Sequence, residues 1–166
     1  MSESLKYVYS KSVIDNEDLD LSKLNELEKW TLELLYKAFG TAVNIRSLDS
    51  SLPGTPDFVL RNEGSDNILL CVFVDGSFWH NGRSSAMQRL ALRHHASGEI
   101  EKAQFWLEKA SENKTRDRGV NKSLKEMGLA YCRLKEDRLN GRDSLGYVAS
   151  SVANAIQRVA LARLKI

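Results

Sequence analysis

The sequence predicts one α/β domain in which a β-sheet carries helices on both faces. Two observations predict it. Residues 68–74 are an uninterrupted apolar run of strand length, which is typical of a central strand buried on both faces. Segments with helical periodicity precede and follow this run. The 166 residues suffice for one domain with its own core, and we expect an N-terminal arm over residues 1–20 and the domain over 21–166.

The first half of the chain predicts one helix and two strands before the apolar run. A helix is expected over about 21–39, and Gly40 follows it as a C-terminal stop signal. Its apolar residues recur at helical spacing, and they are Leu24, Leu27, Trp30, Leu34 and Phe39. Short strands are expected at 42–46 and 57–60, on either side of a loop that contains both prolines of the chain.

The second half predicts mostly helix. Residues 81–98 are basic and are expected to be loop-like or weakly helical, and a helix over 99–127 is expected to break near 113–117. A strand is predicted at 130–134. Ser144 could cap a last amphipathic helix. The face of that helix is expected to consist of Val148, Val152, Ala155, Ile156 and Val159.

Charge is distributed unevenly along the chain. Residues 1–80 carry a net charge of about −6 and residues 81–166 about +8, although the total is only +2. This asymmetry suits a protein whose first half holds metal-binding acids and whose second half faces a polyanion. A set of solvated amphipathic helices would explain the charges equally well.

The sequence also indicates where the protein works. No apolar run reaches the roughly 20 residues that span a bilayer, and the first residues lack the apolar core of a signal peptide. We therefore expect a cytoplasmic protein without a membrane partner. Cys71 and Cys132 lie in apolar runs, so we expect buried reduced thiols, and neither belongs to a CxxC pair that would indicate zinc.

Two carboxylates mark the ends of neighbouring predicted strands. Asp57 begins the strand at 57–60, and Asp75 directly follows the apolar run. Paired carboxylates at adjacent strand ends can hold a hard cation such as Mg²⁺, which can activate water against a phosphodiester. Either aspartate could instead be a simple turn residue, but Phe78, Trp79 and His80 are unusual residues to follow a plain turn. We therefore favour a metal-dependent nuclease.

Three blocks of sequence then point to a family. Pro56-Asp57 with residues 73–80 (FVDGSFWH) is the first block. The second runs from residues 105–109 (FWLEK) through Asn113 and Arg116-Asp117-Arg118 to 124–128 (LKEMG), and the third is Leu27-Glu28-Lys29. In this order they resemble the very-short-patch-repair (Vsr-like) DNA endonucleases over residues 24–145. These mismatch-nicking enzymes are of the restriction-endonuclease-like PD-(D/E)XK superfamily, so the resemblance implies a central mixed sheet flanked by helices.

The resemblance implies a metal site at the strand ends. Asp57 would be the central ligand, Asp75 would bind metal or orient the attacking water, and the backbone carbonyl of Val74 would complete the coordination. The expected cofactor is Mg²⁺, with Mn²⁺ as a substitute. Glu28 would approach the metal from the first helix through water, although a surface glutamate is an equally good interpretation.

The resemblance also implies catalytic and DNA-binding roles. His80 would act as general base or acid near the scissile phosphate, and Asp117 would orient a catalytic partner. Phe78 and Trp79 would wedge into the DNA, although they could simply belong to the core. Basic residues that would contact phosphates of double-stranded DNA are Arg83, Arg89, Arg93, Lys114, Arg116 and Arg118, and a solvated helix face would explain some of them.

The sequence departs from the family in two respects. Ser77 stands where a cysteine is usual, residues 81–85 replace a His/Cys-rich continuation, and residues 133–136 (RLKE) replace a Trp-Glu-Cys-like element. We therefore expect no structural Zn²⁺. The basic N-terminal region of the family is not recognisable in residues 1–20, which leaves T·G specificity open. The alternatives are a nuclease subunit of a restriction, anti-phage or mobile-element system, with its partner proteins, or an inactive DNA-binding module. The last is suggested by Ser77, which occupies the position of the superfamily's lysine.

Overall fold

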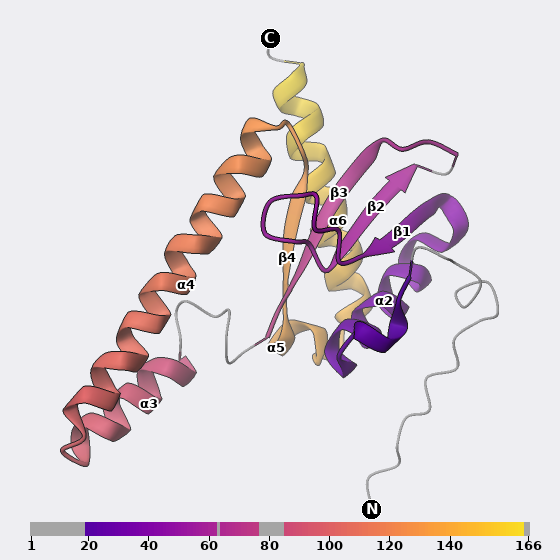
Figure 1. The fold of residues 1–166 in the computed structure, drawn as a ribbon. Helices are drawn as coiled ribbons and strands as arrows, with labels where there is room; N and C mark the ends of the chain where they lie inside the picture. The colour runs from indigo at the N-terminus through magenta and orange to yellow at the C-terminus, as the bar shows by residue number, and fades with distance from the viewer. Residues whose placement is uncertain (1–18, 63, 77–84, 165–166) are drawn as a thin grey trace, which may run out of the picture.

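The computed structural model describes residues 19–62, 64–76 and 85–164 and contains a four-stranded mixed sheet in the order β1-β2-β3-β4 (Figure 1). The strands are β1 (Val43–Ser47), β2 (Phe58–Asn62), β3 (Ile68–Asp75) and β4 (Tyr131–Lys135). The first three pair antiparallel, and β4 runs parallel to β3. The predicted α/β fold with a mixed sheet is confirmed, and each strand begins and ends within two residues of its expected bounds.

Strand β3 is the centre of this sheet. It is the longest strand, and its residues from Leu70 to Asp75 are all buried. A strand that is apolar on both faces is stable only when other parts of the protein cover both of them. Because β3 has β2 on one side and β4 on the other, its carboxyl end brings Asp75 next to residues from both neighbours.

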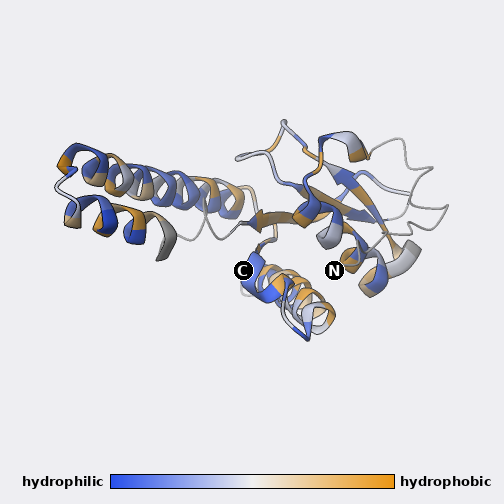
Figure 2. Cartoon of the chain, turned by 90° about the horizontal axis from the view of Figure 1, so that it is seen from below, coloured by the Kyte–Doolittle hydropathy of each residue, from blue (hydrophilic) through white to orange (hydrophobic). Residues whose placement is uncertain are grey.

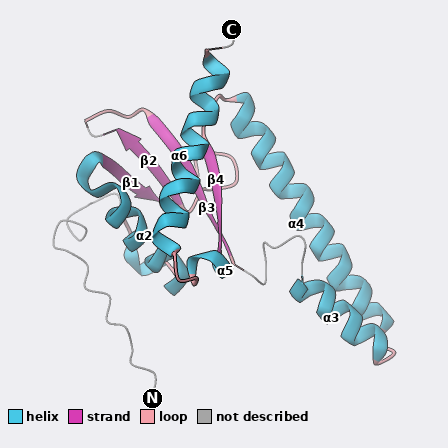
Figure 3. Ribbon diagram, turned by 180° about the vertical axis from the view of Figure 1, so that it is seen from behind, coloured by secondary structure: helices cyan, strands magenta, loops and turns pink. Residues whose placement is uncertain are grey.

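Helices α2 (Glu26–Phe39) and α6 (Ser144–Arg163) cover one face of the sheet (Figure 3). Leu32 and Leu35 of α2 and Val148 and Val152 of α6 are buried in the main core with Val72 and other strand residues. Asn25 and Glu28 form a reciprocal capping box at the start of α2. Short one-turn elements complete this side: η1 (Leu21–Lys23), η2 (Gly40–Ala42) and α5 (Glu136–Leu139).

The second face is covered by the last turns of α4 (Ile100–Glu126). Leu124 is fully buried there against Val59, Cys71 and Phe73. The rest of α4 packs with α3 (Ser85–Ala96) as a helical hairpin that extends away from the sheet (Figure 2). Both faces of the sheet therefore carry helices, as predicted, but the second is covered by one end of a single helix.

The structure corrects two expectations about the helices. Helix α4 runs unbroken through 113–117, because Asp117 and Asn121 lie four residues apart on one face and both bind Arg133. Residues 85–96, expected to be loop-like or weakly helical, form a regular helix, and Met87 and Ala91 are buried where it packs on α4.

The last helix differs in detail from its prediction. Ser144 is its first residue rather than its cap, and Asp143 precedes it without a side-chain capping bond. Ile156 is 36% exposed at the border of the apolar face, whereas Val148, Val152 and Ala155 are buried as expected. Both cysteines are buried free thiols, as predicted, and burial raises the pKa of Cys71 to about 11 and that of Cys132 to about 12. No helix in the described part of the chain has the length and apolar character to cross a membrane.

The loop between β1 and β2 packs closely on α4. Gly54 has a positive φ of 76°, and a Cβ atom added there would lie 2.7 Å from Cγ1 of Val120. Glycine is therefore favoured at this position for two reasons. It adopts the positive φ readily, and it leaves room for the close approach of α4.

We expect Gly54→Ala to destabilise the protein by about 1–3 kcal/mol more than Gly64→Ala, because only the first substitution overpacks a neighbour. Gly64 is a matched control, since its φ is +72° and its added Cβ would meet nothing within 4 Å. Urea unfolding of the two variants measures the difference. Equal losses in the two variants would contradict the close packing of the loop on α4.

Candidate active site

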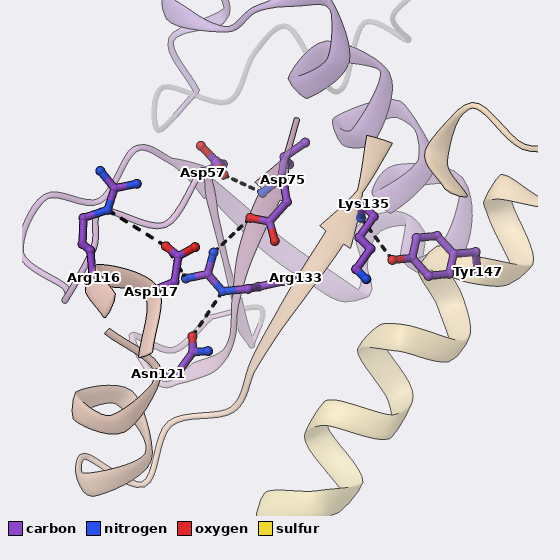
Figure 4. Close-up of polar contacts among 9 residues, drawn as sticks. Asp57, Asp75, Arg116, Asp117, Asn121, Arg133, Lys135 and Tyr147 are labelled. Atoms are coloured by element: carbon purple, nitrogen blue, oxygen red, sulfur yellow. Dashed lines mark hydrogen bonds and ion pairs between the residues drawn. The ribbon is translucent and has the colours of Figure 1, made fainter. Parts of the chain in front are cut away.

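A cleft of about 360 Å³ opens at the carboxyl end of β3. The loop before β2, the end of β3, helix α4 and strand β4 each contribute to its walls (Figure 4). Its lining residues are Gly54, Thr55, Asp57, Phe73, Val74, Asp75, Arg116, Asp117, Val120 and Arg133. Of these ten described residues three are carboxylates and two are arginines, so half of the lining residues are charged.

The sheet brings Asp57 and Asp75 together, as the sequence predicts. Asp57 directly precedes β2, and antiparallel pairing places the start of β2 beside the end of β3. The backbone N–H of Val74 donates to Oδ2 of Asp57 at 2.6 Å, which fixes the Asp57 carboxylate against β3. The carboxylate is thereby held by a backbone group of the residue that precedes Asp75.

Asp57 carries an uncompensated part of the negative charge of the cleft. Burial is the main cause that raises the pKa of Asp57 to about 6, and the nearby carboxylates of Glu28 and Asp75 contribute to this rise. The Val74 N–H bond and the charge of Arg133 lower it, but they do not offset burial. A cation bound beside Asp57 would remove this repulsion.

Glu28 acts on Asp57 from outside the lining of the cleft. Its carboxylate accepts the backbone N–H of Asn25 at 2.8 Å in the capping box, so the start of α2 fixes its position. Its charge is close enough to raise the pKa of Asp57. A water-mediated role of Glu28 at a metal stays a prediction.

Arg133 is the residue of the cleft that the sequence analysis missed. Its Nη1 donates to Asp75 Oδ1 at 2.9 Å and its Nη2 to Asp117 Oδ1 at 3.2 Å (Figure 4). Nε donates to Oδ1 of Asn121 at 3.2 Å, and the guanidinium lies 4.6 Å from the centre of the Phe73 ring. A signal existed in the sequence, because an arginine between Cys132 and Leu134 interrupts an apolar strand.

The structure separates the two arginines of the motif at 116–118. Arg116 lines the cleft, with Nε 4.0 Å from Oδ1 of Asp117, and its side chain is 61% exposed. Arg118 is exposed and is not among the lining residues, since two positions along a helix turn a side chain to the opposite side. Asp117 binds Arg133, so any further partner that it orients stays a prediction.

Several predicted site residues lie outside the described residues. They are Phe78, Trp79, His80 and Arg83, and the altered position Ser77 is also among them. Their proposed roles stay predictions.

The donors of the cleft fit a hard divalent cation. Asp57 and Asp75 could supply carboxylate oxygens, and Val74, which also lines the cleft, is the predicted source of a backbone carbonyl. Among the described residues no group of three or more His, Cys, Asp and Glu side chains forms a metal site, so such a cation would need water as its other ligands. That combination is typical of Mg²⁺, which keeps several waters and uses one or two carboxylates. The pKa of Asp57 is raised mainly by burial and also by the charges of Glu28 and Asp75, and a cation would stabilise its charged form.

A mixed sheet with paired carboxylates where β2 begins and β3 ends is the arrangement of a restriction-endonuclease-like protein. No protein-family model matches the chain. The chain is 34% identical over 106 residues to the DNA mismatch endonuclease Vsr of Escherichia coli (strain K12). The matched segment is 64% of this chain and 59% of that protein. It is 27% identical over 112 residues to the type II nicking enzyme V.HpaIIP of Haemophilus parainfluenzae. This matched segment is 68% of this chain and 70% of that enzyme.

These similarities confirm the recognition made from the motifs: the chain is related in sequence to the Vsr-like endonucleases. It spans less than two thirds of the length of the first of these relatives.

The raised pKa of Asp57 predicts a pH-dependent stability. Between 3.8, the ordinary value, and about 6, the folded protein holds a proton that the unfolded chain has lost. Stability should therefore fall as the pH rises through this window. Asp57→Asn can still accept the Val74 N–H and should lose this fall, which would make it about 1–3 kcal/mol more stable than the wild type at pH 7.

Urea unfolding from pH 4 to pH 8 in EDTA measures this difference. Asp66→Asn is the control, because the Asp66 side chain is 90% exposed, and this variant should keep the wild-type profile. An unchanged decline in Asp57→Asn would contradict the assignment of the titration to Asp57.

Proposed function

We propose that this protein is a Mg²⁺-dependent DNA endonuclease that hydrolyses a phosphodiester bond of double-stranded DNA. The observation that carries the proposal is that Asp57 and Asp75 lie together where β2 begins and β3 ends, in an open cleft with excess negative charge. Similarity to a DNA mismatch endonuclease and to a nicking enzyme supports DNA as the substrate. A DNA substrate also accords with the cytoplasmic location expected from the sequence.

Asp57, Asp75 and the carbonyl of Val74 would hold the metal, and Mn²⁺ should substitute for Mg²⁺ because it also accepts oxygen ligands. A bound divalent cation would activate water and stabilise charge on the phosphate. The chain's own groups prepare this site. The Val74 N–H positions Asp57, and Arg133 positions Asp75 and Asp117.

Other residues act on the DNA itself. Arg116 is an exposed cation at the mouth of the cleft and would bind a phosphate beside the scissile one. His80 would take or give the proton at the reacting oxygen. Phe78 and Trp79 would wedge into a base step, and a mismatch would lower the cost of opening it.

A second candidate is a nuclease of a restriction, anti-phage or mobile-element system without T·G specificity. It is favoured by Ser77 and residues 81–85, which replace the family's usual metal-binding residues, and by the similarity to a type II nicking enzyme. Such an enzyme would act with partner proteins of its system. The third candidate, a DNA-binding module without catalysis, is tested by the same experiment.

We expect the purified protein to cut DNA with Mg²⁺ or Mn²⁺ and not in EDTA, and Asp57→Asn to lose at least about 10³-fold in rate. The substrates are supercoiled plasmid and labelled matched and T·G duplexes. Asp66→Asn should keep full activity. Full activity in Asp57→Asn would contradict the proposed site.

The substrates separate the candidates. Cutting confined to the T·G duplex would indicate a mismatch-repair nickase. Cutting of matched DNA would favour a defence or mobile-element nuclease. Binding of DNA with no cutting under any metal condition would leave the binding module.

A further inference from the structure

A groove lies between strand β4 and helix α6, at the edge of β4 that faces away from β3. It consists of a hollow of about 650 Å³ that continues into one of about 440 Å³, and the two share Tyr131 and Arg158. We call it the β4–α6 groove. The cleavage mechanism proposed above uses none of its residues except Arg133.

The charged residues that line the β4–α6 groove all have the same sign. They are Lys125, Arg133, Arg158 and Arg163, and within the described part of the chain no carboxylate lines either hollow. Ser151, Asn154 and Gln157 add neutral hydrogen-bonding groups. Arg133 is already paired with Asp75 and Asp117, so Lys125, Arg158 and Arg163 are the cations that remain for an anionic ligand. Placed around a partly apolar lining with these neutral groups, they are complementary to the phosphates of a polyanion.

A solvated helix face would not explain this composition. Helix α6 contains Arg158 and Arg163 and no aspartate or glutamate along its length. Helix α4, which is also largely exposed, alternates charges and forms pairs such as Lys109–Glu112 and Lys122–Glu126. The absence of acids is therefore a property of α6, and not of the exposed helices of this protein in general.

The two arginines of α6 are held in place by local bonds. Nη2 of Arg163 donates to the carbonyl of Gly128 at 3.1 Å, which ties the end of α6 to the turn before β4. Nε of Arg158 donates to the carbonyl of Asn154 at 3.3 Å. Because a carbonyl does not neutralise a guanidinium, both positive charges remain at the groove.

The β4–α6 groove adjoins the candidate active site. Arg133 lines both the groove and the cleft of Asp57 and Asp75. We propose that the groove binds the phosphodiester backbone of duplex DNA next to the cleaved phosphate. The choice of DNA as the ligand rests on the proposed function. Arg158 and Lys125 would contribute to the affinity for DNA without a preference for its sequence.

The test is the binding of a short fluorescein-labelled duplex to the full chain in EDTA, from about 50 to 200 mM NaCl. Arg158→Gln should raise the Kd about three- to tenfold and lower the slope of log Kd against log salt by about one. Arg46→Gln is the matched control, since Arg46 lies on β1 at the opposite edge of the sheet and its side chain is 37% exposed. Circular dichroism should show both variants folded, because Arg158 is exposed.

Equal Kd and equal salt slope in the two variants would overturn the proposal and would leave an acidic protein as the ligand class for the groove. The result is separable from the proposed function. If the wild type cuts DNA and Arg158→Gln binds like Arg46→Gln, the groove fails and the nuclease stands. If the wild type cuts no DNA but binding weakens only in Arg158→Gln, the groove stands and the nuclease fails.

Discussion

One guanidinium connects the elements that build the cleft. Arg133 on β4 binds Asp75 of β3 and both Asp117 and Asn121 of α4, while its plane lies near the ring of Phe73. Its side chain is 17% exposed, so these contacts are made largely out of water. Removing one partner of such a buried pair costs about 3–5 kcal/mol, because the other charge is left uncompensated. The position of Asp75, and the attachment of α4 to the sheet, both depend on it.

The cleft meets two opposing requirements. Its charge must be negative enough to attract a divalent cation, and the protein must stay folded before the cation arrives. Burial, together with the charges of Glu28 and Asp75, raises the pKa of Asp57 to about 6, and the Val74 N–H and the Arg133 charge limit this rise. A metal bound at Asp57 would stabilise a carboxylate whose charged form is disfavoured in the free protein.

The strands of the sheet and the paired aspartates could be predicted from the sequence, because both depend on local sequence patterns. An apolar run that ends in Asp75, and a loop with two prolines that ends in Asp57, specify strand ends without knowledge of the packing. The role of Arg133 could not be read in this way, since it depends on the parallel register that sets Phe73 opposite Arg133 and on the rotation of α4. The same tertiary bonds keep α4 helical through a polar segment that reads as a break, and packing on α4 keeps α3 helical.

The most direct test of this account is the Mn²⁺ affinity of Arg133→Lys, measured by titration without DNA. Lysine keeps the charge but cannot reproduce the guanidinium fork, so the variant isolates the positioning of Asp75 and Asp117. Arg61→Lys is the control, because Arg61 on β2 is also poorly exposed and pairs with Asp49 at 3.2 Å outside the cleft. We expect Mn²⁺ affinity to fall about tenfold in Arg133→Lys and to stay unchanged in Arg61→Lys. An affinity of Arg133→Lys within about twofold of the wild type would contradict the account.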